Sequence, residues 1–420
     1  MRVLFISNYR PSFLKGQDIT YGGWASSLIN CIIETGVVQV GWAYPSNTTL
    51  IPDGEIKYYP IKKNVKNKLK RKLFSIFFLR HCIYTLEDKI IINGSLNVIE
   101  EFKPDIIHIW GSEFAFGLVA KYTKTPVILH IQGILNPYFD AFFPPGINLR
   151  SLFNIGTIKS FIKYKREYYQ WKNYKVPREL EIYHSIKYVI GRTDWDHNVI
   201  SVINPNIKYY IGNEMLRPLM INSQKWKFHT NREKLIITST VSDTLYKGVD
   251  VILKAAFLIK KNWGNNFIWN IYGISNAKVF ERNYGLKAKK VNVSCNGIVD
   301  IKTLLEKLLE SDVYCHSSYI ENSPNSICEA QYIGLPVVAV DGGGTASLLK
   351  KGSGILIPSN DAYQISYYIL RLKKDNIEAN FISNNEIKIA EERHNSQKIV
   401  SNLIKIYEKV IDNESIIRSK

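Results

Sequence analysis

The chain has 420 residues, of which 45% are hydrophobic and 22% are charged. This composition is normal for a globular protein and argues against disorder, and the length suffices for two domains of ordinary size. It carries 55 Lys and Arg against 37 Asp and Glu, a formal charge of +18 that favours anionic partners such as nucleotide diphosphates, acidic phospholipid or nucleic acid. No uninterrupted apolar run reaches about eighteen residues, so we expect no membrane-spanning helix.

The N-terminal run Met1–Ile6 predicts a strand and is too short for a signal peptide. The five cysteines form no CxxC pair and lie mostly in apolar runs, which is typical of core residues in a reducing cytosol. His and Cys show no ligand spacing, so we expect neither a metal nor a cofactor, and we expect a cytoplasmic protein.

Short apolar runs alternate with helical patterns along the first half, which predicts an α/β domain with a parallel sheet. After the first strand, Tyr21-Gly22-Gly23-Trp24 opens a helix, and Gly22 and Gly23 would let a ligand approach the backbone there. A plain loop–helix turn is the alternative. The pattern is not GxGxxG, which argues against a dehydrogenase. The strands expected in this half are Val3–Ser7, Val38–Ala43, Asp105–Trp110, Val127–Ile131, Tyr188–Arg192 and Lys208–Ile211.

Two segments of the first half concentrate the positive charge. Lys62–Arg80 holds eight Lys and Arg interleaved with Leu, Ile and Phe, and Lys159–Arg178 mixes basic residues with Phe, Tyr and Trp. This pattern suits an anionic membrane surface, although a solvated Lys-rich helix face is the alternative. No helix-turn-helix, zinc-finger or RNA-recognition signature accompanies the charge, so we do not expect nucleic acid as a partner.

Two expected strands of this half carry histidines, His108 and His130. A lone His in an apolar strand is usually structural, which we expect for His108. Gly191-Arg192 also ends an expected strand and is a candidate for the wall of a cleft, without an assigned chemistry.

A second αβ series follows the polar stretch Met220–Arg232, so we expect two Rossmann-like domains, 1–220 and 221–395, and a C-terminal helix, 396–420, that returns to the first domain. Open parallel sheets bind ligands outside the carboxyl ends of their strands, which places chemistry in the following loops. The strands expected here are Leu235–Ser239, Phe267–Tyr272, Val291–Cys295, Val313–His316, Pro336–Val340 and Gly354–Ile357.

The second half carries the most informative loop. Glu321 follows the expected strand Val313–His316, and Glu329 lies about one turn inside a helix that opens near Pro324. Two carboxylates at this spacing can reach different parts of one elongated ligand, although a capping Glu and a solvent-facing Glu are the alternative.

Two further loops follow strands of this half. Lys247-Gly248 would place an ammonium where departing phosphate charge could be neutralised, and Gly342, Gly343 and Gly344 would let the backbone approach a diphosphate. Each signal is weak alone, but together they converge on one site.

In this order, Lys247-Gly248, Gly273, Gly297, Glu321 with seven residues before Glu329, Gly334-Leu335-Pro336 and Gly343 resemble the donor domain of retaining glycosyltransferase family 4, over about residues 235–410. The resemblance implies the GT-B fold, with two Rossmann-like doubly wound domains that face a central cleft.

The resemblance implies roles for single residues. Lys247 would bind the donor diphosphate, and Glu329 the ribose hydroxyls. Glu321 with the backbone of Asn322 and Ser323 would hold the transferred sugar, and His130 would lie near its reacting centre. The base would lie near Gly273 and Gly297, while Gly22, Gly23 and Gly343 would approach the donor phosphates.

One position departs from the family pattern. The family often has an Arg five residues before the Lys, as a second diphosphate ligand, and Ser242 stands there. Either phosphate binding is weaker, or another cation takes this duty.

We therefore expect a retaining, metal-independent hexosyltransferase that moves a sugar from a nucleotide diphosphate donor to a glycan, lipid-linked in view of the basic segments. We expect peripheral binding to the inner membrane face and a part in surface polysaccharide biosynthesis. The alternatives are a non-catalytic glycan- or membrane-binding GT-B paralogue and a nucleotide-sugar epimerase.

Overall fold

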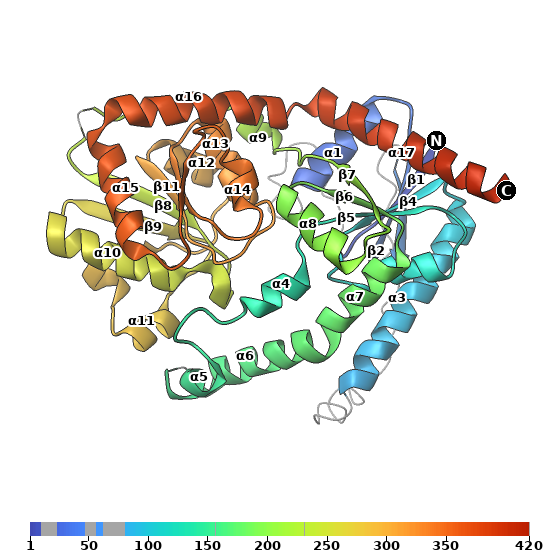
Figure 1. Ribbon diagram of the computed structural model, residues 1–420, viewed down its shortest axis with the longest axis horizontal. Helices are drawn as coiled ribbons and strands as arrows, with labels where there is room; N and C mark the ends of the chain where they lie inside the picture. The colour runs from blue at the N-terminus through green and yellow to red at the C-terminus, as the bar shows by residue number, and fades with distance from the viewer. Residues whose placement is uncertain (10–22, 47–55, 62–79, 156, 231, 420) are drawn as a thin grey trace.

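The structure is a computed structural model that describes residues 1–9, 23–46, 56–61, 80–155, 157–230 and 232–419. The described residues form two parallel β-sheets, each flanked by helices (Figure 1). The first sheet has the order β3-β2-β1-β4-β5-β6-β7, and the second has the order β10-β9-β8-β11-β12-β13. The two-sheet α/β class predicted from the sequence is therefore confirmed.

The strands of the first sheet are β1 (Arg2–Ile6), β2 (Gln39–Pro45), β3 (Lys57–Ile61), β4 (Ile106–Trp110), β5 (Val127–His130), β6 (Tyr188–Gly191) and β7 (Lys208–Ile211). Those of the second sheet are β8 (Leu235–Thr240), β9 (Phe267–Tyr272), β10 (Val293–Cys295), β11 (Val313–His316), β12 (Val337–Val340) and β13 (Ile355–Ile357).

The helices of the first half are α1 (Gly23–Glu34), α3 (Arg80–Phe102), α4 (Leu135–Asp140), α5 (Leu149–Ile155), α6 (Ile158–Gln170), α7 (Val176–Ser185), α8 (Asp194–Ile203) and α9 (Pro218–Ile221). The remaining helices are α10 (Val249–Trp263), α11 (Lys278–Tyr284), α12 (Ile301–Leu309), α13 (Asn325–Ile333), α14 (Thr345–Leu348), α15 (Ala362–Lys374), α16 (Asn376–Arg393) and α17 (Ser396–Ser419).

The expected strands are found within two residues of their expected bounds. Strand β3 is the exception, because the sequence pattern predicts no strand there. It contains Pro60, whose missing N–H weakens a strand pattern, and it lies at the edge of its sheet, where a missing donor is tolerated.

Strand β1 shows how the first sheet builds two cores. Val3 and Phe5 pack on one face with α1 and α17, whereas Leu4 and Ile6 pack on the other face with α3, α7 and α8. Alternate side chains of a strand point to opposite faces, so a continuous apolar run is what a sheet covered on both sides requires.

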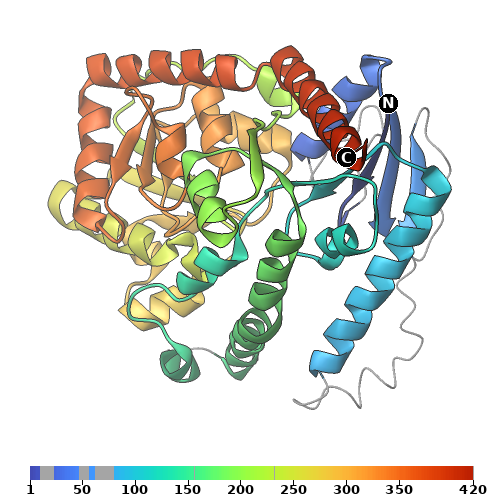
Figure 2. The same ribbon diagram turned by 45° about the vertical axis from the view of Figure 1, so that its right-hand side comes forward.

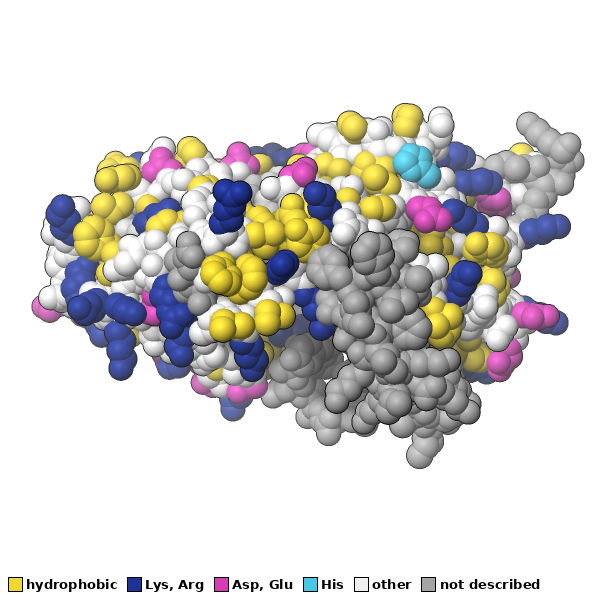
Figure 3. All heavy atoms as spheres, turned by 90° about the horizontal axis from the view of Figure 1, so that it is seen from below, with side chains coloured by type: hydrophobic (Ala, Val, Ile, Leu, Met, Phe, Trp, Pro, Cys, Tyr) yellow, Lys and Arg dark blue, Asp and Glu magenta, His cyan; other side chains and the backbone are white. Residues whose placement is uncertain are grey.

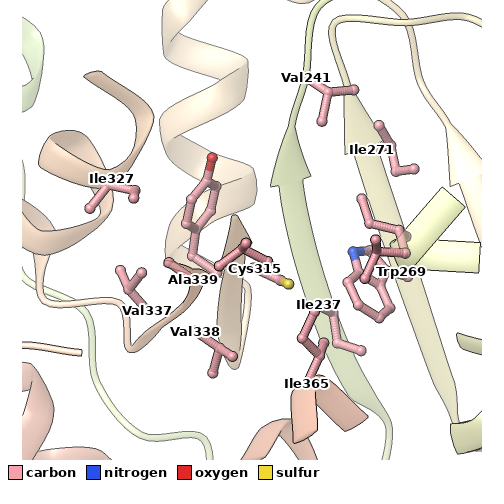
Figure 4. Packing of buried hydrophobic residues seen from close by; sticks show 14 of the residues in the cluster. Ile237, Val241, Trp269, Ile271, Cys315, Ile327, Val337, Val338, Ala339 and Ile365 are labelled. Carbon is pink, nitrogen blue, oxygen red and sulfur yellow. The ribbon is translucent and has the colours of Figure 1, made fainter. Parts of the chain in front are cut away.

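The second sheet has one large core. Strands β8, β9, β11 and β12 contribute Ile237, Trp269, Cys315 and Val338, and α15 contributes Ile365 (Figure 4). The indole N–H of Trp269 donates to Ser239 Oγ at 3.0 Å, so its one polar atom is satisfied inside the core.

The C-terminal helices link the two sheets. Helix α16 packs on α13 of the second sheet, and α17 then crosses to the first sheet and packs on α1 (Figures 1 and 2). Leu403, Tyr407 and Val410 of α17 are buried in the core of the first sheet.

Further contacts between the halves come from α4 to α7. The hydroxyl of Tyr284 donates to the carbonyl of Pro145 at 2.5 Å, and the Lys163 ammonium lies 2.5 Å from Asp243. Trp226, in the connection between the two sheets, is buried, and its indole N–H donates to the carbonyl of Ser311 at 2.7 Å. No helix in the described ranges is long and apolar enough to cross a membrane.

Candidate functional site

A cavity of about 410 Å³ is lined by loops of both halves. It lies at the carboxyl ends of parallel strands, where open α/β sheets bind ligands. Lining residues from the first half are Trp24, Gln132 and Arg192, and those from the second half are Thr240, Val241, Ser242, Lys247, Tyr272, Gly273, Ile298, Val299, Leu304, Glu321, Ser323, Pro324, Asn325 and Ser326.

Lys247 reaches this cavity from the turn between β8 and α10. Gly248 follows it with φ +71°, and a Cβ there would lie 1.9 Å from the carbonyl oxygen of Ser317. Only glycine fits this left-handed position so close to another backbone. The hydroxyl of Ser317 also donates to the Lys247 carbonyl at 2.9 Å. These contacts fix the backbone of the turn, and they therefore fix the position from which the Lys247 side chain extends.

The ammonium of Lys247 pairs directly with the carboxylate of Glu321. Both side chains are largely buried, and burial lowers the pKa of Lys247 to about 8. The structure thus brings together two residues that the sequence analysis singled out separately, 74 positions apart.

The glycine loop after β12 is joined to the Glu321 loop. The Gly344 N–H donates to the Glu321 carbonyl at 2.7 Å, and Glu321 forms an isolated parallel bridge with Gly343. Gly343 has φ +68°, and a Cβ there would lie 2.2 Å from the Glu321 carbonyl oxygen. The glycines are needed here for backbone contact with Glu321, which holds that loop at the cavity.

Asn322 and Ser323 contact residues outside the second sheet. The Asn322 N–H donates to the hydroxyl of Tyr138 at 2.7 Å, and its side-chain oxygen accepts from Thr193 Oγ1 at 2.8 Å. The hydroxyl of Ser323 donates to Glu214 at 2.8 Å. The backbone N–H of Asn322 was predicted to bind the transferred sugar. In this structure it already donates its hydrogen bond to Tyr138 of α4.

Glu329 lies on α13, one turn beyond the lining residues Asn325 and Ser326, and it pairs with Arg217. The Arg217 Nε donates to Glu329 Oε1 at 3.0 Å. Burial raises the pKa of the Glu329 carboxyl, and the Arg217 guanidinium opposes that shift. Its predicted contact with a ribose stays a prediction, and its partner is a residue that the sequence analysis did not identify.

His130 ends β5 behind the cavity wall. Its ring stacks on Trp110 with centroids 5.1 Å apart and packs edge-on against Trp24, which lines the cavity, at 5.2 Å. Burial, together with His108, holds the pKa of His130 well below its usual range, so its ring is neutral. Its predicted role beside a transferred sugar stays a prediction.

Of the remaining predicted residues, Gly273 lines the cavity, and its N–H donates to the carbonyl of Gly297 at 2.7 Å. Gly23 begins α1. Gly22 lies outside the described residues.

The first half contributes Trp24, Gln132 and Arg192 to the wall; Arg192 was a candidate for a cleft wall without an assigned chemistry, and Trp24 and Gln132 had no predicted role. Each follows a strand end or opens a helix, which is a position where ligand contacts are expected. The position of Arg192 directly after β6 indicates a place at the ligand-binding edge of the sheet, but its residue type alone does not indicate which group it binds.

A carboxyl group of the first half has an unusual pKa. Burial raises the pKa of Glu113 to about 7, and the neighbouring Glu179 adds to this effect, whereas Arg192 opposes it. Glu113 follows β4 at the same sheet edge as His130 and Arg192.

Glu214, Cys328 and His394 place possible ligand atoms within 4.8 Å of one another. An Arg393 nitrogen, however, lies 3.1 Å from the Glu214 carboxylate, and His394 Nδ1 bonds to the Glu214 carbonyl at 2.8 Å. A guanidinium already supplies the positive charge, so we interpret this cluster as an ionic contact between segments rather than as a metal site.

A family model described as Glycosyl transferases group 1 matches residues 220–389. An uncharacterized glycosyltransferase from Methanocaldococcus jannaschii is 27% identical over 171 residues, which cover 40% of this chain and 43% of the relative, so the match spans less than half of either protein.

Two solved structures cover nearly the whole chain. Sucrose-phosphate synthase from Thermosynechococcus elongatus has a TM-score of 0.70 at 13% identity, over 98% of this chain and 99% of that chain. HepE from Anabaena, in complex with UDP and glucose, has a TM-score of 0.59 at 13% identity, over 97% of this chain and 100% of that chain. At such identities the likeness shows the fold, which is GT-B.

Proposed function

We propose, from the premise that residues 220–389 belong to the glycosyl transferases group 1 family, that this chain transfers a sugar from a nucleotide diphosphate donor to a glycan acceptor. The observation that carries the proposal is the cavity between the two halves, where Lys247 and Glu321 meet on the family-matched side. The HepE structure, which holds UDP and glucose, has the same fold.

We assign Lys247 to the donor diphosphate and Glu321 to the transferred sugar. An ammonium fixed by the Gly248 turn can neutralise the charge that develops on the leaving diphosphate, and such preorganised stabilisation is usually a large part of catalysis. A donor that enters would replace part of the Lys247–Glu321 contact, giving the ammonium to phosphate and the carboxylate to sugar hydroxyls. No metal is needed for this charge balance.

We further propose retention of configuration. Among the described lining residues, Glu321 is the one carboxylate, and we assign it to the sugar hydroxyls, so the described wall offers no second carboxylate as a nucleophile. The bond from the anomeric carbon to the phosphate oxygen would break, its electron pair leaving with the diphosphate. The acceptor hydroxyl oxygen would bond to the same face of that carbon, and its proton would pass to the departing phosphate oxygen.

The acceptor is proposed to be lipid-linked, with the enzyme bound peripherally on the cytoplasmic membrane face during surface polysaccharide synthesis. Helices α5 and α6 support this, because Phe153, Ile158 and Ile162 are 65%, 77% and 57% exposed and Lys159 and Arg166 lie beside them. Figure 3 shows the molecule from below the view of Figure 1, and the face that carries these helices has hydrophobic side chains among Lys and Arg. The other basic segment, Lys62–Arg80, lies outside the described residues except for Arg80.

The donor site is tested by thermal shift with UDP-, GDP-, ADP- and dTDP-sugars. One nucleotide class should raise the melting temperature of wild type, since a ligand that binds only the folded state stabilises it by about 2.7 kcal/mol at 100 times its Kd. Lys247→Met and Glu329→Ala should lose most of the shift, whereas Lys261→Met, an exposed lysine on α10, should keep it. No shift with any donor would contradict the proposal and favour the non-catalytic paralogue.

The reaction is tested by incubating the bound donor with and without glycan acceptors and following the products by NMR. Release of nucleotide diphosphate that depends on the acceptor, with the donor's anomeric configuration in the product, is expected. Conversion of the donor sugar to its epimer without an acceptor would instead identify an epimerase.

Membrane binding is tested by sedimentation with anionic and neutral vesicles. The variant Phe153→Ser/Ile158→Ser/Ile162→Ser should lose binding to anionic vesicles. The control Val202→Ser/Ile377→Ser changes two apolar residues elsewhere that are each 85% exposed, and it should retain binding. Equal binding of both variants would remove α5 and α6 from the proposed surface.

A further inference from the structure

Arg192 is a buried cation in the wall of the cavity. It follows β6 directly, and its relative exposure is 5%. Its N–H donates to Asp196 at 2.9 Å, and its carbonyl accepts from the Arg393 guanidinium at 3.2 Å. Asp196 also forms the capping box at the start of α8 with Thr193, so the backbone that carries Arg192 is fixed from both sides.

The guanidinium of Arg192 is held without an opposite charge in contact. It donates to the Gln132 carbonyl at 2.7 Å, and it lies 5.4 Å from the centroid of the Trp24 ring. Over the described ranges, no carboxylate oxygen lies within 4.0 Å of its nitrogens, and its Nε has no hydrogen-bond partner. A buried charge is costly unless it is paired, so an unpaired guanidinium in a cavity wall indicates an anionic ligand.

Two carboxyl groups interact electrostatically with Arg192, but neither neutralises its guanidinium. Glu214 has its own partner, because Arg393 lies 3.1 Å from its carboxylate. Burial raises the pKa of Glu113 to about 7, so this carboxyl is only partly ionised at neutral pH even with Arg192 near it. The positive charge of Arg192 is therefore left for a ligand.

The described residues of the opposite wall offer no second free cation. Among its described lining residues Lys247 is the one cation, and it already contacts Glu321. Ser242 lines the same wall with a neutral hydroxyl, 3.2 Å from Thr244 Oγ1. The described lining thus carries one positive charge in excess, and Arg192 is its source.

We infer that Arg192 is the second oxyanion-binding cation of the cavity, so that the diphosphate of the donor is bound by Lys247 from one half and by Arg192 from the other. This inference rests on the proposed function. A planar guanidinium forms paired hydrogen bonds with phosphate oxygens, and the unpartnered Nε is one of the donors available for them. The diphosphate then bridges the two halves, so donor binding depends on the arrangement in which both halves line this cavity.

The experiment is calorimetric titration with the nucleoside diphosphate of the accepted base and with the corresponding nucleoside. Arg192→Gln should weaken diphosphate binding at least about tenfold, the loss expected for hydrogen bonds to a charged group, and leave nucleoside binding within about twofold. Arg150→Gln, which changes an exposed arginine, should leave both unchanged. Thermal melting without ligand checks that each variant is folded.

Two further variants test the inference, and one of them, Arg192→Lys, keeps it falsifiable if Arg192→Gln folds poorly. Ser242→Arg adds a guanidinium to the opposite wall of the same cavity, so Arg192→Gln/Ser242→Arg should regain diphosphate affinity over Arg192→Gln alone. Arg192→Lys should lie between wild type and Arg192→Gln, because an ammonium keeps the charge but not the paired donors.

The outcomes separate this inference from the proposed function. If wild type binds no nucleotide, both fail. If wild type binds and Lys247→Met loses diphosphate affinity while Arg192→Gln retains it, the inference alone fails. An increase in KM for a phosphorylated acceptor, with unchanged donor affinity, would assign Arg192 to an acceptor phosphate and overturn the diphosphate assignment.

Discussion

The guanidinium of Arg217 and the carboxylate of Glu329 form a salt bridge that joins the segment between the two sheets to α13. Glu329 is almost fully buried, whereas Arg217 is about one-fifth exposed. The carboxylate proposed to bind the donor ribose is thus held by a residue that enters from the connection between the halves.

Removing Arg217 alone should destabilise the protein, because it leaves a buried carboxylate unpaired. We expect Arg217→Met to cost about 2 kcal/mol, below the roughly 3–5 kcal/mol of a fully buried pair since Arg217 is partly solvated. Urea denaturation measures the effect. The double variant Arg217→Met/Glu329→Gln should recover most of the loss, and no recovery would show that Arg217 acts through other contacts.

Diphosphate affinity should depend on the protonation of Lys247. Its pKa is lowered to about 8, so above pH 8 the unliganded site increasingly holds a neutral amine that attracts phosphate poorly. Calorimetric titration should show affinity that is constant below about pH 7 and declines above pH 8. Lys247→Arg stays charged, so the decline should disappear in that variant, and an unchanged decline would exclude Lys247 as its cause.

Gly248→Ala should distort the turn that carries Lys247. Its Cβ would lie 1.9 Å from the Ser317 carbonyl oxygen, and its φ of +71° disfavours any side chain. Gly285→Ala is the matched control, since its φ is +66° and nothing lies within 4 Å of the new Cβ. We expect Gly285→Ala to cost about 1 kcal/mol of stability with nucleotide binding intact, and Gly248→Ala to cost more and to weaken binding.

Glu113 should make the protein less stable as pH rises. Its pKa is about 7 when folded and near the ordinary 4.5 when unfolded, so the folded chain binds more protons between these values. Stability is therefore lost from pH 4.5 to 7, and the penalty is complete above pH 7.

Melting temperatures at pH 5 and pH 8 test this dependence. Glu113→Gln should gain more over wild type at pH 8 than at pH 5. The exposed Glu408→Gln should show no such difference. An equal gain in melting temperature at pH 5 and pH 8 would mean that the Glu113 carboxyl does not titrate in this range.

The alternation of elements could be predicted from the sequence because most strands are buried on both faces and form continuous apolar runs. Strand β3 could not, since Pro60 breaks its pattern and only its place at the sheet edge allows it. The neighbourhood of Lys247 and Glu321 follows from parallel strands whose loops share one edge.

The partners of these residues follow from contacts between the halves. Arg217 meets Glu329 across 112 positions, and Tyr138 meets Asn322 across 184. No local spacing encodes such pairs, and they depend on how two separately patterned units pack. Arg192 illustrates the same limit. The sequence predicts its place after β6, but the absence of an opposite charge beside its guanidinium depends on which side chains the folded wall brings together.

The crossing of α17 has a consequence for folding during synthesis. Tyr407 of α17 lies in the core of the first sheet, and its hydroxyl is 2.6 Å from His108 Nδ1 on β4. A ribosome makes α17 after both sheets, so the face of the first sheet that α1 and α17 cover together stays partly exposed while the second sheet is translated. The first half is therefore exposed to aggregation for that interval, and its folding is completed last.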